Sequence, residues 1–341
     1  MSSTKPRLAF AMRPELPIGF FGPEEWARLE AVAEITSREA FTSFEGEAAR
    51  AAVEDADIIL GAWGCPPLDA GNLAKLPRLK LLAYGAASLR FVATRDMWRR
   101  GVIVTSAVSA MAVPVAEFSY AAIIFAGKDI FRLRDRHRAS RGALGADSRV
   151  SYDRPQIGNY QRRIGIVGAS RIGRLVIDML VRGGFAVGVY DPFMSAEAAA
   201  TMGATKMDLH PLLEWCDTLS LHAPIQPETR HMIGRAELAL LHDDACFINT
   251  ARGWLVDHAA LEAELVSGRL RALIDTPDPD PLPASSPLYD LSNVVLTPHL
   301  AGAQGNELRR LADAAIREVE RFAAGLPPLH PVVEADMRRI A

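Results

Sequence analysis

Residues 164–173 read Ile-Gly-Ile-Val-Gly-Ala-Ser-Arg-Ile-Gly, and residues 187–191 read Val-Gly-Val-Tyr-Asp. The apolar run at 163–167 predicts a buried strand, and the residues from Gly168 to Gly173 predict a tight turn after it. An amphipathic run at 174–182 predicts a helix, and a second apolar run predicts a strand that ends before Asp191. This order is typical of a βαβ unit that binds a dinucleotide.

The residues of this unit suit that ligand, with one exception. Gly168 permits the tight turn, Gly173 allows close packing of helix and strand, and the helix N-terminus would face the pyrophosphate. Asp191 follows about 20 residues later, where a carboxylate can accept hydrogen bonds from a ribose. Ser170 replaces the middle glycine of the G-x-G-x-x-G pattern, so this pattern alone does not establish dinucleotide binding.

Composition restricts the class of protein. A chain of 341 residues is long enough for about two domains. The formal net charge of −3 shows no basic excess, which argues against nucleic acid and anionic membranes as partners. Cys65, Cys216 and Cys246 are widely spaced and form no C-x-x-C pair, so free thiols in a reducing compartment are expected. No signal segment or apolar run near the length of a membrane span is evident, and we predict a cytoplasmic protein.

Apolar runs alternate with helical patterns along most of the chain, which predicts an α/β fold with parallel sheets. The predicted strands are residues 8–12, 58–61, 79–83, 102–105, 163–167, 186–190, 218–221, 246–249, 271–274 and 294–296. The predicted helices are residues 23–33, 68–76, 90–99, 174–182 and 306–324, the last with an apolar face expected to join a core.

Residues 113–131 predict a helix of different character. Pro114 suits a first helical turn, and few polar residues follow it. A helix that is apolar nearly all round must be buried. The sequence leaves open whether a core or another subunit covers it.

Polar residues gather in four loops that follow predicted strands, as expected of an open α/β sheet. These loops are residues 221–224, 249–253, 275–280 and 297–299. Together with the glycine turn, with Val189-Tyr-Asp191 and with Pro227-Glu-Thr229, their order and spacing closely resemble the D-isomer-specific 2-hydroxyacid dehydrogenases. The resemblance extends from residue 113 to the C-terminal helix and is weaker in the N-terminal third.

The resemblance implies a catalytic set of Arg252, Asp280 and His299. A histidine that titrates near neutrality can take the hydroxyl proton of an alcohol and return it. The arginine can clamp a substrate carboxylate with two hydrogen bonds, and the aspartate would orient the histidine and favour its charged form. The family usually has glutamate in place of Asp280, so either the backbone lies closer or a water bridges the gap. Asp278 is a second candidate for this role.

The resemblance also implies NAD as the cofactor, because Asp191 would repel a 2′-phosphate and no cation follows it. Ser170 could donate a hydrogen bond to a phosphate. The expected cofactor-binding residues are Gly168, Ser170, Arg171, Ile172, Gly173, Asp191, His222, Ala223, Pro224, Thr229, Thr250, Ala251, Arg252, Asp275 and His299. Within this set, Asp275 is expected near the nicotinamide carboxamide, and His222 is expected to be a packing residue rather than a second base. The expected substrate-binding residues are Ala86, Ala87 and Ser88, through backbone N–H groups, with Arg252 and His299.

The implied fold has two Rossmann-like domains, each a doubly wound parallel sheet, with the active site in the cleft between them. Residues 1–110, completed by 305–341, would form the substrate domain, and 111–304 would form the NAD-binding domain. The helix at 113–131 would join two subunits of a homodimer. No metal is expected.

The function that follows is reversible, NAD-linked interconversion of a small 2-hydroxyacid and its 2-oxoacid, with His299 as the acid and base. One alternative is a dehydrogenase of another small anion, of the formate or phosphite type. Asp280 argues against it, because formate-oxidising relatives have glutamine there. A second alternative is a non-enzymatic protein that senses NAD(H), such as a transcriptional corepressor.

Overall fold

The computed structural model of the chain describes residues 5–141 and 157–338. It divides into two compact units, which we call unit 1 (Met1–Met111 with Ala303–Ala341) and unit 2 (Ala112–Gly302). Residues 1–4, 142–156 and 339–341, which belong to the predicted domains 1–110, 111–304 and 305–341, lie outside the described residues.

Unit 1 contains a five-stranded parallel sheet with the strand order β2-β1-β3-β4-β5. Its strands β3 and β4 are buried along their whole length, as expected when helices cover both faces of a parallel sheet. The strands are β1 (Arg7–Ala11), β2 (Glu34–Ala40), β3 (Ile58–Gly61), β4 (Leu81–Tyr84) and β5 (Ile103–Ser106). The helices are α1 (Leu16–Phe20), α2 (Pro23–Val32), α3 (Glu47–Val53), α4 (Ala70–Ala74), α5 (Arg95–Arg99) and α13 (Leu308–Ala323).

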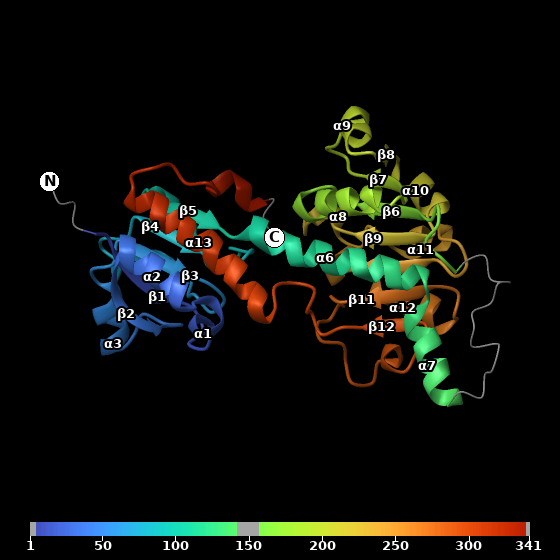
Figure 1. Cartoon of the computed structure of the whole chain (residues 1–341), viewed down its shortest axis with the longest axis horizontal. Helices are drawn as coiled ribbons and strands as arrows, with labels where there is room; N and C mark the ends of the chain where they lie inside the picture. Colours follow the sequence, from blue (N-terminus) through green and yellow to red (C-terminus); the bar gives the residue numbers. More distant parts are fainter. Residues whose placement is uncertain (1–4, 142–156, 339–341) are drawn as a thin grey trace. The chain divides into compact units, whose positions relative to one another are not determined.

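The C-terminal helix α13 completes the core of unit 1, although it comes from the far end of the chain (Figure 1). Its residues Leu311, Ala315 and Val319 are buried in one cluster with the apolar residues of β1, β3 and β4. On the polar side, Arg28 of α2 donates to the carboxylate of Glu320 at 2.8 and 3.0 Å. The prediction that this apolar face belongs to a core is confirmed.

Unit 2 contains a seven-stranded parallel sheet with the order β12-β11-β10-β9-β6-β7-β8 (Figure 1). The chain leaves β6 in one direction through β7 and β8 and returns to its other side at β9, so the carboxyl ends of β6 and β9 form the topological switch point. The strands are β6 (Arg163–Val167), β7 (Ala186–Tyr190), β8 (Thr205–Lys206), β9 (Thr218–Leu221), β10 (Cys246–Asn249), β11 (Arg271–Ile274) and β12 (Val294–Leu296). The helices are α6 (Val108–Gly127), α7 (Ile130–Ser140), α8 (Arg171–Arg182), α9 (Ala196–Thr201), α10 (Leu209–Trp215), α11 (Arg235–Leu240) and α12 (His258–Val266), and the first four residues of α6 belong to unit 1.

All ten predicted strands are confirmed, and the six in unit 2 have the predicted bounds. Two strands were not predicted. β2 is an edge strand with mostly partly exposed residues, so it lacks a continuous apolar run, and β8 has only two residues. The predicted helices 68–76 and 90–99 are too long. Asp69, for example, caps α4 by accepting from Asn72 N, which fixes the start of that helix at Ala70.

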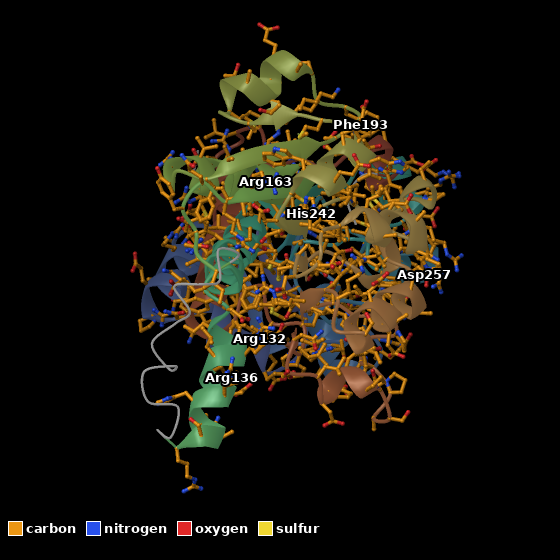
Figure 2. The ribbon with its side chains drawn as sticks, turned by 90° about the vertical axis from the view of Figure 1, so that its right-hand side faces the viewer. Arg132, Arg136, Arg163, Phe193, His242 and Asp257 are labelled. Carbon is orange, nitrogen blue, oxygen red and sulfur yellow. The ribbon has the colours of Figure 1, made fainter. Side chains whose placement is uncertain are left out.

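The helix predicted at 113–131 differs from expectation in its bounds and in the place of its proline. Helix α6 begins at Val108, so Pro114 lies in its interior rather than in the first turn, and the helix ends at Gly127. One face of the helix, with Ala116 and Ile123, packs in the core of unit 2. This favours burial in a core over burial against another subunit. After it, α7 has no buried residues and carries Arg132 and Arg136 on its surface (Figure 2).

The prediction that no apolar run approaches the length of a membrane span is wrong. Helix α6 has 20 residues and a mean hydropathy of 1.7, which meet the length and composition of a span. In the most apolar 18-residue stretch of this helix, 39 % is buried inside the protein. Core helices of globular proteins have the same length and composition, so this feature is weak evidence for a membrane.

The three cysteines are unpaired, as predicted, and all three are buried. Burial raises the pKa of the Cys216 thiol to about 12 and raises the pKa values of Cys65 and Cys246 as well. Because the thiolate is the nucleophilic form, these cysteines are chemically inert packing residues.

Candidate active site

The glycine turn between β6 and α8 is packed so closely that it excludes side chains at two positions. Gly168 has φ +92°, and a Cβ on it would lie 2.6 Å from the backbone nitrogen of Ala223. A Cβ on Gly173 would lie 2.0 Å from the carbonyl oxygen of Gly168. The turn, the start of α8 and the loop after β9 therefore form one backbone-lined surface, which is the shape that a dinucleotide pyrophosphate requires.

Asp191, at the end of β7, holds this turn in place. Its Oδ2 accepts a hydrogen bond from Ala169 N at 2.7 Å, and its Oδ1 accepts one from Phe193 N at 2.8 Å. Arg174 donates from Nε to the carbonyl oxygen of Ala169 at 2.9 Å. A carboxylate has about four acceptor positions, so Asp191 retains capacity for the hydroxyl groups of a ribose.

Ser170 stands at the N-cap of α8, with Arg171, Ile172 and Gly173 in the first turn after it. Its side chain is exposed and does not cap the helix, so its hydroxyl lies beside the positive end of the helix dipole. Gly168, Ser170, Arg171, Ile172, Gly173 and Asp191 are therefore brought together, and together they fit a dinucleotide.

The loop after β9 carries His222, Ala223, Pro224 and Thr229. His222 is buried, its Nε2 lies 2.9 Å from Ser220 Oγ, and burial lowers its pKa to about 3. It is neutral at physiological pH and has no pKa suited to a general base, in line with the expected packing role. Thr229 Oγ1 lies within hydrogen-bond distance of Pro224 O, at 2.8 Å, which closes this loop.

The loop after β10 carries Thr250, Ala251 and Arg252, and Asn249 organises it. Asn249 is fully buried, accepts from Ala251 N at 3.0 Å and donates from Nδ2 to Arg252 O at 3.0 Å. Thr250 Oγ1 lies 2.7 Å from Ser119 Oγ on α6. Sequence reasoning did not single out Asn249, although a buried strand that ends on a side-chain amide is a recognisable signal.

Arg252 has the environment of an anion receptor. Its side chain is half-buried, and its Nη1 donates to Ala251 O at 2.6 Å. Within the described part of the chain, no carboxylate lies within ion-pair distance of it. Burial lowers its pKa, while Asp280 and Asp275 oppose this shift at longer range. A partly buried guanidinium without a paired carboxylate is costly, and a bound anion would remove that cost.

Asp275 fixes the loop that carries His299. The carboxylate is 1 % exposed and accepts from Thr297 Oγ1 at 2.6 Å, Leu300 N at 2.8 Å and Ala301 N at 3.0 Å. The backbone carbonyl of Asp275 also accepts from His299 N at 3.1 Å. This supporting role was not anticipated, because it depends on residues more than 20 positions away. The expected contact of Asp275 with the nicotinamide stays a prediction.

His299 and Asp280 meet directly. His299 Nδ1 lies 2.7 Å from Asp280 Oδ2, and the side chains are 48 % and 41 % exposed. The shorter aspartate thus reaches the histidine without a bridging water, because the backbone of the loop lies close enough. Asp278 takes a different position, since its backbone N–H donates to His258 Nε2 at 3.2 Å. Of the two candidates, the geometry favours Asp280.

Asp280→Asn is expected to lower kcat for 2-oxoacid reduction about tenfold at pH 8, with the affinity for NADH unchanged. The reason is that the carboxylate accepts a charge-assisted hydrogen bond from His299 Nδ1, whereas an amide oxygen accepts it more weakly and orients the ring less well. Steady-state rates at pH 8 measure this loss. Asp278→Asn is the matched control, and a larger loss with that variant would reassign the acidic partner.

In unit 1, a group of backbone N–H donors lies after the carboxyl end of β4. It is formed by Ala86, Ala87 and Ser88. Ser106 Oγ lies 2.9 Å from Ala87 O and 3.1 Å from Ala86 O, so these carbonyls are held. Within the described residues, the N–H groups of Ala86, Ala87 and Ser88 donate to no protein group. Consecutive backbone N–H groups of this kind suit a carboxylate.

No group of three or more histidine, cysteine or carboxylate side chains that could hold a metal ion occurs among residues 5–141 and 157–338.

A family model, "D-isomer specific 2-hydroxyacid dehydrogenase, NAD binding domain", matches residues 121–301, which is more than half of the chain. A glyoxylate reductase of Korarchaeum cryptofilum is 30 % identical over 280 residues, covering 81 % of this chain and 82 % of that protein. A D-3-phosphoglycerate dehydrogenase of Methanocaldococcus jannaschii is 30 % identical over 295 residues, covering 85 % of this chain. The match covers 53 % of that dehydrogenase, so the chain spans about half of its length.

Solved structures show the same fold. A D-isomer specific 2-hydroxyacid dehydrogenase from Lactobacillus delbrueckii ssp. bulgaricus, in its NAD complexed form, superposes with a TM-score of 0.78 at 22 % identity, covering 96 % of this chain and all of that one. A phosphoglycerate oxidoreductase from Rhizobium etli gives the same TM-score at 24 % identity, covering 96 % and 98 %. At these identities the likeness concerns the fold alone.

Proposed function

Because the chain belongs to the D-isomer specific 2-hydroxyacid dehydrogenase family, we propose that it interconverts a small 2-hydroxyacid and its 2-oxoacid. NAD is the cofactor that belongs to the domain matched at residues 121–301. NAD, when bound, accepts the hydride from the hydroxyl-bearing carbon or returns one to the oxo carbon. The glycine turn and Asp191 would hold it.

The chain's own residues then supply binding and proton transfer. Arg252 binds the substrate carboxylate with its guanidinium fork and polarises the neighbouring oxygen. His299 takes the hydroxyl proton during oxidation and returns it during reduction, while Asp280 orients the ring through Nδ1 and leaves Nε2 for the substrate. The backbone N–H groups of Ala86, Ala87 and Ser88 give a further site for the substrate.

One observation carries the proposal: Arg252, half-buried and without a paired carboxylate, and the His299–Asp280 pair follow strands of the same sheet edge. An anion clamp together with an acid–base histidine is what oxidation of a hydroxyacid requires. A protein that only senses NAD(H) needs neither of them.

Further proposals concern the setting of the protein. Unit 2 would be the NAD-binding domain and unit 1 the substrate domain. The buried free thiols suit the cytoplasm. A homodimer would form through the 113–131 region, which has two exposed apolar side chains. Phe125, near the end of α6, is 42 % exposed, and Ile130, at the start of α7, is 41 % exposed. Light scattering in solution measures the mass.

The deciding experiment follows absorbance at 340 nm while NADH or NADPH is mixed with a panel of 2-oxoacids. We expect NADH oxidation with at least one 2-oxoacid and a preference for NADH, since Asp191 would repel a 2′-phosphate. NADH binding without turnover on any 2-oxoacid would point to the sensor alternative. Turnover with formate or phosphite and NAD, and with no 2-hydroxyacid, would point to the other dehydrogenase alternative.

A further inference from the structure

The loop that carries Asp280 packs against the loop that carries Arg252. A Cβ on Gly253 would lie 2.3 Å from the carbonyl oxygen of Pro277 and 2.7 Å from Cβ of Asp278. Asn249 Nδ2, which binds Arg252 O, also lies 3.5 Å from Thr276 O. The first residues of the Asp280 loop are therefore packed against the backbone of the Arg252 loop. The position of these residues determines where Asp280 points.

His258 holds the next part of the loop. It is the first residue of α12, and its Nε2 accepts a hydrogen bond from Asp278 N at 3.2 Å. Asp257, the N-cap of α12, holds the helix start by accepting from Ala260 N at 3.1 Å. Asp278 is two residues before Asp280, so this bond restrains the backbone immediately ahead of the histidine's carboxylate partner.

An imidazole can accept this bond only when it is neutral. Burial lowers the pKa of His258, and the nearby His231 lowers it further, while the carboxylates of Asp278 and Asp257 act in the opposite direction. Its place at a helix N-terminus also disfavours positive charge. His258 is therefore an acceptor at neutral pH and loses that capacity on protonation.

We propose that His258 is a positioning residue: by accepting the Asp278 N–H it fixes the loop and holds Asp280 against His299. The proposal rests on the proposed function only for its kinetic consequence. The geometric consequence, the contact between His299 and Asp280, can be measured without turnover.

Two substitutions separate the hydrogen bond from the bulk of the side chain. His258→Gln keeps an acceptor near the place of Nε2, whereas His258→Leu keeps similar bulk without an acceptor. At pH 8 we expect His258→Leu to lower kcat about tenfold with the affinity for NADH unchanged, and His258→Gln to stay within about twofold of the original chain. His210→Leu, at an exposed histidine of α10, is the control for histidine loss elsewhere in unit 2.

The pH dependence gives a second kinetic test. The original chain should lose kcat at acid pH as His258 becomes protonated and its Nε2 can no longer accept the Asp278 N–H. The Gln variant cannot be protonated in this range, so it should lack this loss. Asp278→Asn removes a charge that favours protonated His258, so it should move this loss to lower pH.

The third test uses nitrogen-15 NMR of the histidine rings in the full chain. His299 that donates from Nδ1 to Asp280 has a defined tautomer, which we expect in the original chain and in His258→Gln. In His258→Leu the tautomer signature should resemble that of Asp280→Ala.

An unchanged tautomer and an unchanged kcat in His258→Leu would each overturn the positioning role. Equal losses in the Gln and Leu variants would mean a role in packing only. An absence of turnover on every 2-oxoacid would contradict the proposed function, while the tautomer would still decide the role of His258.

Discussion

Replacement of His299 by asparagine is expected to lower kcat for 2-oxoacid reduction by about 10²- to 10⁴-fold, the range for loss of a general acid or base. NADH affinity should change less than about twofold, because the glycine turn and Asp191 would carry most of the binding of the cofactor. Asparagine is preferred to alanine here, because His299 has φ +53° and asparagine tolerates this left-handed conformation. Stopped-flow turnover and NADH fluorescence titration give the two quantities.

His299→Ala serves as the companion variant, since it removes every hydrogen bond of the side chain. If both variants bind NADH far more weakly while the remaining bound fraction turns over normally, His299 belongs to the cofactor site and another residue transfers the proton. His222 is not that residue on the present geometry, because it is buried and its pKa is lowered to about 3.

Arg252→Gln is expected to lower kcat/KM for a 2-oxoacid by about 100-fold or more, because two charge-assisted hydrogen bonds to the substrate carboxylate are lost. Arg252→Lys keeps the charge but not the planar fork, so it should recover only part of the loss. Steady-state kinetics with saturating NADH measures both variants. Full recovery by lysine would show that charge alone binds the substrate.

The fold of this chain could be predicted from local sequence where strands are buried on both faces. In β9, β10 and β11 every residue is buried, so the apolar run and the strand coincide. The prediction failed at β2, whose residues Glu34, Arg38 and Glu39 are exposed on an edge strand that β1 alone pairs. There the backbone pairing, and not an apolar pattern, defines the strand.

The candidate site was predictable at residues whose chemistry shows in the loop sequence, such as Arg252 and His299. The supporting role of Asp275 was not, because it acts through hydrogen bonds from backbone N–H groups more than 20 residues away, and no local pattern encodes such a pairing. Asn249 differs, since it bonds to Ala251 N and Arg252 O within its own loop, and its place at the end of a buried strand was a local signal. The choice between Asp278 and Asp280 also required the path of the backbone between successive prolines.

The left-handed backbone of His299 has a consequence for protein engineering. A saturation library at this position would give mixed results, because most side chains would strain the loop whatever their chemistry. Loss of expression in such a library would therefore be mistaken for loss of catalysis. Glycine, asparagine and aspartate are the informative members, since their soluble yield should match the parent and their residual activity can be read directly.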